Sequence, residues 1–227
     1  MRFKGILMDN DGTLMDFHAG EANAIREVLE KMSISDPNAP AVYSRINEQC
    51  WKDFEKGTIT QPQLRVRRFR ELAEHYSCVG DPAEFAKWYE ESLAHQSILF
   101  SGALEVVKKI SEHLPVLILT NGISKVQHGR IDTSPIAPYL SGLLISSEIG
   151  SPKPAPDMYM KALAMLGGVS PDEVLMIGDS LTSDIAGAIN VGIPACWYNP
   201  SHKAKPEGMR IDYEIDRMEQ MIEVALS

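Results

Sequence analysis

Short runs of apolar residues, each bounded by turn-forming residues, recur along the chain. They occupy 3–8, 115–119, 143–146, 173–177 and 193–197, and each has the length of a buried strand. Stretches with apolar residues at helical spacing lie between most of them, at 103–112, 157–166, 182–190 and 217–226. This alternation predicts an α/β fold, in which a Rossmann-like parallel sheet is flanked by helices on both faces.

Residues 16–99 interrupt this rhythm. They contain no convincing strand, and their charged, alanine and aromatic residues fall at the spacing of helices over 18–32, 41–55, 61–75 and 82–95. We therefore expect an all-helical cap domain, 16–99, inserted into an α/β core domain made of 1–15 and 100–227. The insertion leaves the core just after two acidic residues, so it is placed to close over a site there.

Composition narrows the class of protein. The net charge of −9 argues against a nucleic acid polymer as partner, because phosphate backbones select basic surfaces. The three cysteines are widely spaced and fit reduced thiols, and no apolar run has the length of a signal-peptide core or a membrane span. We expect a cytoplasmic enzyme that acts on a small molecule and contacts no membrane.

Two carboxylates, Asp9 and Asp11, directly follow the first apolar run. Side chains alternate along an extended chain, so these two share one side while Asn10 points away. Ligands of open α/β sheets bind at the carboxyl ends of the strands, where one carboxylate can attack while its neighbour moves a proton. Taken alone, the same residues also fit a strand followed by an ordinary Asp-Gly turn.

Two further segments carry groups that suit an anion. The second predicted strand ends in Thr120, Asn121 and Gly122 before a helix, which offers a hydroxyl and unpaired backbone N–H groups. Lys153 lies between two prolines that restrict the backbone, so it is placed to bridge a nucleophile and a phosphate. By themselves, an ordinary helix cap and an exposed loop lysine would explain these residues.

A second acidic pair, Asp179 and Asp184, follows the predicted strand at 173–177. Several carboxylates that converge on one point repel one another unless a cation joins them, and hard oxygen ligands select Mg²⁺. Helix capping is the alternative explanation for this pair.

Taken in order, these segments resemble the motifs of a known family. The segments resemble the four motifs of the haloacid dehalogenase superfamily. In this chain the motifs are Asp9-x-Asp11-Gly12-Thr13, Thr120, Lys153 and Gly178-Asp179-x4-Asp184, and together they span almost the entire chain. The resemblance implies that Asp9 attacks phosphorus to form an aspartyl-phosphate. It implies that Asp11 protonates the leaving oxygen and then activates the hydrolytic water.

The resemblance also assigns the remaining groups. Thr120 and the N–H groups around Asn121 and Gly122 would hold the phosphoryl oxygens, and Lys153 would offset the charge on phosphate and nucleophile. Mg²⁺ would be bound by the Asp9 carboxylate, the Asp11 carbonyl and Asp179, with Asp184 as a ligand or beside the ligands.

The segments around 178–185 and 190–200 further resemble the house-cleaning pyrimidine 5′-nucleotidases of this superfamily, which implies pyrimidine nucleoside 5′-monophosphates as substrates. Asn10 departs from the pattern, since a small or apolar residue is more usual there. Asp11 favours phosphate over halide chemistry, because dehalogenation leaves no alkoxide to protonate. Three alternatives remain open: a phosphatase of a sugar phosphate or phosphoglycolate, a phosphomutase, and a non-enzymatic metal-binding or partner-binding protein.

Two groups of residues in 16–99 bear on the choice of substrate. Aromatic side chains that offer a face to a nucleobase, although most are expected in the core, are Phe17, Trp51, Phe54, Trp88 and Tyr89. Basic side chains that could contact a phosphate, although a solvated helix surface is expected for them, are Arg65, Arg67, Arg68 and Arg70.

Overall fold

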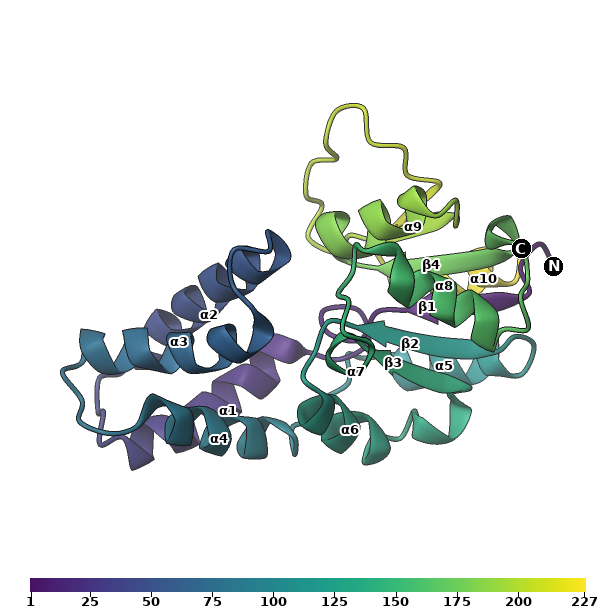
Figure 1. Ribbon diagram of the computed structural model, residues 1–227. Coiled ribbons are helices and arrows are strands. Elements are labelled where there is room, and N and C mark those ends of the chain that lie inside the picture. The colour runs from purple at the N-terminus through teal and green to yellow at the C-terminus, as the bar shows by residue number, and fades with distance from the viewer.

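A single all-parallel sheet of six strands forms the centre of the computed structural model, which describes all 227 residues. The strand order is β3-β2-β1-β4-β5-β6 (Figure 1). The strands are β1 (Gly5–Met8), β2 (Val116–Thr120), β3 (Gly142–Ile145), β4 (Val174–Gly178), β5 (Ala195–Tyr198) and β6 (Tyr213–Ile215). The predicted α/β fold and its five strands are confirmed, and β6 is an additional edge strand.

Helices cover both faces of the sheet because its central strands are apolar on both sides. Along β1, Ile6 and Met8 pack on one face with α5 and α10, whereas Leu7 packs on the other face with α8 and α9. The helices outside 16–99 are α5 (Ala103–Ser111), α6 (Ser124–Asp132), α7 (Ser146–Ile149), α8 (Pro156–Met165), α9 (Ala186–Asn190) and α10 (Gln220–Ala225). Short helical turns are η1 (Ala137–Tyr139), η2 (Pro171–Glu173) and η3 (Leu181–Ile185).

Residues 16–99 form the four helices that were predicted for them. These are α1 (Phe17–Lys31), α2 (Ala39–Glu55), α3 (Gln61–His75) and α4 (Pro82–Leu93). They pack around an aromatic centre of Tyr43, Phe69 and Tyr89, whose rings lie 5.2–5.5 Å apart. Figure 1 shows these helices beside the carboxyl ends of the parallel strands, so they face the end of the sheet at which a ligand is expected.

Two hinge segments, 14–17 and 96–100, connect these four helices to the sheet. They run side by side, because Met15 and Leu99 form an antiparallel bridge. The N–H group of Asp16 also donates to the carbonyl of Ile98 at 2.9 Å. The chain therefore leaves and re-enters the sheet region at one place.

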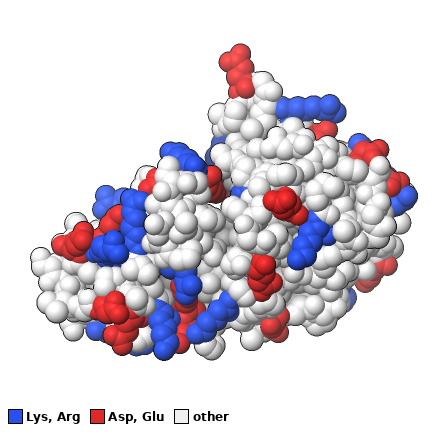
Figure 2. All heavy atoms as spheres, viewed as in Figure 1, with Lys and Arg blue, Asp and Glu red and all other residues white.

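Charged side chains of both signs are interspersed on the face of the molecule that Figure 2 shows, above all over the helices of 16–99. None of the helices combines the length and the apolar character needed to cross a membrane. The cytoplasmic location stays a prediction.

Candidate active site

A cavity of about 270 Å³ lies between the carboxyl ends of the strands and the four helices of 16–99. Residues from all four sequence segments line it on the core side: Asp9, Asp11, Thr120, Lys153 and Asp179. The structure therefore brings together the residues that the sequence singled out, although more than 140 positions separate the first from the third segment.

Lys153 lies at the centre of these residues and is 2% exposed. Its Nζ donates to Asp9 Oδ1 at 2.6 Å, to Asp184 Oδ1 at 2.7 Å and to the Leu119 carbonyl at 2.7 Å. Burial disfavours the charge, but Asp184 and Asp9 outweigh it and hold the pKa of Lys153 above its ordinary value. The ammonium group thus uses all three of its protons and stays charged.

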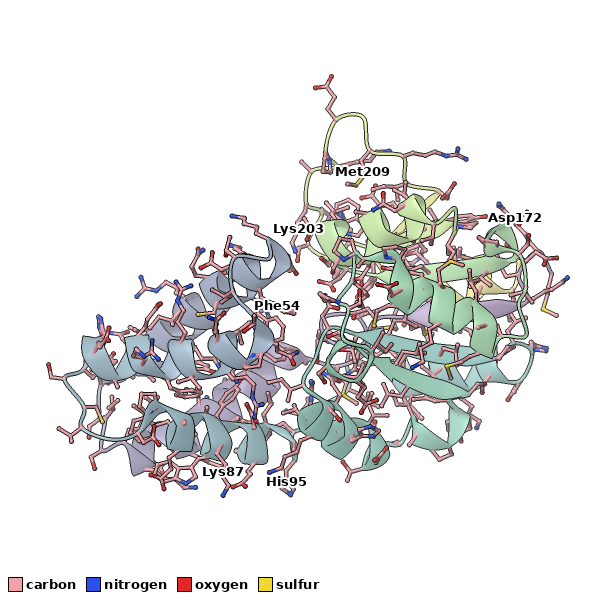
Figure 3. All side chains as sticks on the ribbon, in the orientation of Figure 1. Phe54, Lys87, His95, Asp172, Lys203 and Met209 are labelled. Carbon is pink, nitrogen blue, oxygen red and sulfur yellow. The ribbon has the colours of Figure 1, made fainter.

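The carboxylates around Lys153 have raised pKa values. Burial, followed by the charge of Asp184, raises the pKa of Asp9 to about 7. Burial and the charge of Asp9 raise the pKa of Asp179 to about 6, although Lys153 and Lys203 act in the opposite direction. Figure 3 labels Lys203, which lies on the loop after β5. One buried lysine therefore does not balance the negative charge that is gathered here.

Oxygens of Asp9, Asp179 and Asp184 all lie within 4.8 Å of one another. Asp184 already uses both of its oxygens, since Oδ1 accepts from Lys153 and Oδ2 accepts from the N–H of Ser180 at 3.1 Å. This oxygen-only cluster fits a hard divalent cation.

Two glycines allow the carboxylates of Asp179 and Asp184 to lie close to the backbone of neighbouring segments. Gly12 has a φ of +89°, and a Cβ there would lie 2.9 Å from the carboxylate of Asp179. A Cβ at Gly178 would lie 2.3 Å from Asp184 Oδ2. Side chains at these positions would therefore displace the carboxylates.

The Asn121 side chain joins two of the loops. Its Nδ2 donates to the carbonyl of Lys153 at 2.8 Å, and its Oδ1 accepts from the N–H of Lys153 at 2.7 Å. On the same loop, the N–H of Gly122 donates to Thr120 Oγ1 at 3.2 Å. The loop after β2 and the loop that carries Lys153 are consequently held as one unit.

Sequence reasoning missed two residues of α6 that contact Asp11. Nε2 of Gln127 donates to Asp11 Oδ2 at 2.7 Å, and the guanidinium of Arg130 contacts Asp11 Oδ1. Both residues line the cavity. The only signal in the sequence is their spacing of three on the helix that follows Gly122, which places them on one helix face.

Two buried aromatic residues that sequence reasoning also missed support the acidic loop. The hydroxyl of Tyr159 donates to the carbonyl of Ser183 at 2.9 Å, and Nε1 of Trp197 donates to the carbonyl of Asp179 at 3.0 Å. They fix the backbone from which the second acidic pair projects.

On the side of 16–99, three of the five candidate aromatic residues line the cavity: Phe17, Trp51 and Tyr89. Phe54 packs edge-on against Trp51, with 5.7 Å between ring centroids, and Figure 3 shows it at the end of α2 next to the core. Trp88 packs against another aromatic ring of α4 and does not line the cavity.

The surface position predicted for Arg68 is wrong. This side chain is 2% exposed and lines the cavity, whereas Arg65 and Arg67 are partly exposed and form ion pairs. Nη1 of Arg68 donates to Asn47 Oδ1 at 3.0 Å, but its Nε and Nη2 make no hydrogen bond, and Nη2 lies 3.9 Å from Glu90 Oε1. The hydroxyl of Tyr89 also lacks a partner. The cavity therefore ends in buried hydrogen-bond donors that the protein itself does not satisfy.

Comparisons with known proteins show which proteins this chain is similar to. The model of the haloacid dehalogenase-like hydrolase family matches residues 3–192. Pyrimidine 5′-nucleotidase PynA of Streptococcus pneumoniae is 34% identical over 98% of this chain and 95% of that protein. Pyrimidine 5′-nucleotidase YjjG of Escherichia coli is 31% identical over 97% of each chain. The magnesium-bound crystal structure of the HAD-hydrolase YfnB of Bacillus subtilis superposes with a TM-score of 0.92, at 30% identity over 99% of each chain.

Proposed function

We propose a specific reaction for this chain, which belongs to the haloacid dehalogenase-like hydrolase family and is one of its phosphatases. It hydrolyses a small phosphomonoester in two displacements on Asp9. The observation that carries the proposal is the position of this carboxylate, which Lys153 holds at 2.6 Å on the wall of the cavity that Asp11 also lines.

In the first displacement, an oxygen of Asp9 bonds to phosphorus while the bond to the leaving oxygen breaks, and Asp11 gives that oxygen its proton. In the second, Asp11 takes a proton from the water that cleaves the aspartyl-phosphate. Division into two displacements is the usual gain of covalent catalysis.

The cradle after β2 would hold the transferred group. We assign the phosphoryl oxygens to the hydroxyl of Thr120 and to the backbone N–H groups of Asn121 and Gly122, of which the latter would exchange its hydrogen bond to Thr120 Oγ1 for one to the phosphate. Lys153 offsets the repulsion between carboxylate and phosphate, which is about 4 kcal/mol for two unit charges 4 Å apart at an effective dielectric constant of 20.

Magnesium is the proposed cofactor. Asp9 and Asp179, with the backbone carbonyl of Asp11, would hold it, and Asp184 would keep the geometry because both of its oxygens are engaged. When bound, the ion supplies the positive charge that lets an anionic nucleophile approach an anionic phosphate.

Pyrimidine nucleoside 5′-monophosphates are the proposed substrates, and residues 16–99 are the proposed cap that selects them. Support comes from the relatives PynA and YjjG and from the far end of the cavity. Phe17 and Trp51 offer aromatic faces to a base, and the unpartnered donors of Arg68 and Tyr89 suit the carbonyl oxygens of a pyrimidine.

A sugar phosphate or phosphoglycolate is the second candidate substrate class, because the same core would act on it. Phosphoglycolate has no ring to stack on the aromatic residues, so the cavity favours it less. A phosphomutase would differ by keeping a stable phosphoenzyme and passing the phosphate to a second sugar. Family membership sets aside the non-enzymatic alternative.

The test is phosphate release with and without Mg²⁺ from a panel of nucleoside monophosphates, sugar phosphates and phosphoglycolate. We expect selective turnover of pyrimidine monophosphates and a loss of about 10⁴-fold or more in Asp9→Asn, since removal of a nucleophile has effects of this size or larger. Turnover of sugar phosphates alone would keep the chemistry and replace the substrate. Activity of Asp9→Asn at the wild-type rate would contradict the mechanism.

A further inference from the structure

A buried arginine of α6 joins Asp11 to the hinge. The side chain of Arg130 is 0% exposed, its Nη1 contacts Asp11 Oδ1, and its Nε donates to the carbonyl of Gln96 at 3.0 Å. Its remaining nitrogen, Nη2, has no partner, and the residue lines the cavity. One side chain therefore contacts the carboxylate and a hinge segment at the wall of the cavity.

Gln127, three residues earlier on α6, holds the other oxygen of Asp11. Its Nε2 donates to Asp11 Oδ2 at 2.7 Å, and its Oε1 accepts from Nδ2 of Asn10 at 2.7 Å. The bond from Asn10 determines which end of the Gln127 amide faces Asp11. It also explains the polar residue at position 10, because this amide orients the side chain that orients Asp11.

Helix α6 contacts both hinge segments through Arg130. Oγ of Ser97 donates to the carbonyl of Arg130 at 2.7 Å, and the guanidinium carbon of Arg130 lies 5.9 Å from the ring centroid of Phe17. A displacement of the hinge would consequently displace Arg130, and Asp11 with it.

We propose that Arg130 is a positioning residue, which links the Asp11 carboxyl group to the hinge and thereby fixes its orientation. The inference rests on the acid and base role proposed above for Asp11. Proton transfer to the leaving oxygen requires that carboxyl group within hydrogen-bond reach while the bond from phosphorus breaks. Arg130 itself neither gives nor takes a proton.

A comparison of leaving groups tests this role. 4-Nitrophenolate departs from phosphorus without protonation, whereas the alkoxide of a nucleoside or sugar needs a proton. With enzyme in excess over substrate, the release of the leaving group reports the first displacement alone. The two substrates are 4-nitrophenyl phosphate and the alkyl phosphate that the substrate panel shows to be hydrolysed best.

We expect Arg130→Met to slow release from the alkyl phosphate by about 10- to 100-fold, since a complete general acid contributes about 10²- to 10⁴-fold. The rate of 4-nitrophenolate release should also fall, but by a factor at least tenfold smaller than that for the alkyl phosphate. Arg130→Lys should recover part of the loss, and Gln127→Met should show the same preference without removal of a charge. Lys125→Met is the matched control, because this exposed cation of α6 contacts Glu91 of α4 and not Asp11.

Equal slowing of both substrates by a folded Arg130→Met protein, with no recovery in Arg130→Lys, would overturn the positioning role. Equal slowing by Asp11→Asn would instead contradict the acid role in the proposed function. If Asp11→Asn slows the alkyl phosphate more than 4-nitrophenyl phosphate, but neither Arg130→Met nor Gln127→Met does so, the proposed function stands and only this inference is rejected. Thermal unfolding of each variant shows whether it is folded.

Discussion

The surroundings of Asp9 and the far end of the cavity differ in how their buried polar groups are satisfied, although Nη2 of Arg130 on α6 also lacks a partner. At the core end, Lys153 places all its protons on acceptors, and both oxygens of Asp184 accept hydrogen bonds. At the end formed by 16–99, Arg68 and Tyr89 keep donors without partners. An unsatisfied buried donor costs about 1–3 kcal/mol, so such groups are rare unless a ligand or water satisfies them.

This difference separates the groups expected to carry out the reaction from the groups expected to select the substrate. Groups that are already hydrogen-bonded in the free protein need no rearrangement when charge develops on the phosphate. Donors without partners discriminate strongly, because a ligand without acceptor atoms leaves them unsatisfied while a matching ligand does not. We therefore expect the core end to determine the reaction and the far end to determine the substrate.

The largest effect is expected from Lys153→Met. It leaves the carboxylates of Asp9 and Asp184 buried without their cation, and loss of one partner of a buried ion pair costs about 3–5 kcal/mol. Activity should fall by about 10²-fold or more, because the nucleophile loses its orientation. Urea unfolding and phosphate release measure the two effects, with the exposed Lys161→Met as control. Wild-type stability of Lys153→Met would show that the core end does not depend on this network.

A smaller effect is expected at the far end. Tyr89→Phe removes one unpartnered donor and should lower kcat/KM for uridine monophosphate, relative to phosphoglycolate, by about tenfold, the size of one hydrogen bond to a ligand. Ser92→Ala is the matched control, because its hydroxyl on α4 is also buried and unpartnered but Ser92 does not line the cavity. The same change in ratio for both variants would assign the effect to packing in 16–99 rather than to substrate recognition.

The smallest effect concerns pH and magnesium. The pKa values of Asp9, about 7, and Asp179, about 6, lie above the value near 4 of an unfolded chain. The folded protein should therefore bind protons at these two groups more tightly than the unfolded chain, and their contribution to stability should fall as pH rises from about 4 to 7. Magnesium binds the ionised carboxylates, so its stabilisation should be larger at pH 8 than at pH 5.5, by a few degrees in Tm. An equal shift at both pH values, or an undiminished shift in Asp179→Asn, would argue against this cation site.

Most of the fold was predictable because the central strands are buried on both faces. Burial on both faces requires continuous apolar runs, such as Val116–Thr120, and such runs are visible in the sequence. The edge strand Tyr213–Ile215 has three residues, of which one is buried, so no apolar run marks it. The predicted helix at 182–190 begins with the wide turn of Leu181–Ile185, in which the N–H of Ile185 donates to the carbonyl of Ser180, five residues back, at 3.1 Å.

The core end of the site was predictable for a related reason. Asp9 and Asp179 follow strands directly, so finding the strands also finds them, whereas Lys153 lies in a loop between two helices and is marked by its two flanking prolines. Arg130 was not found and Arg68 was placed on the surface, because the burial of both depends on partners far away in the sequence. Arg130 meets Asp11 across 119 positions, and a helix rich in arginine reads as a surface helix until its neighbours are known.

The bridge between Met15 and Leu99 bears on how this molecule can be rebuilt. Because the chain enters and leaves the insertion at adjacent points, all of 16–99 can in principle be exchanged for another domain without a change in the order of the strands. Such a chimaera would inherit its reaction from one parent and its choice of substrate from the other. Arg130 now meets the backbone carbonyl of Gln96, so a graft that keeps this contact joins before that residue and leaves the hinge segment 96–100 with the core.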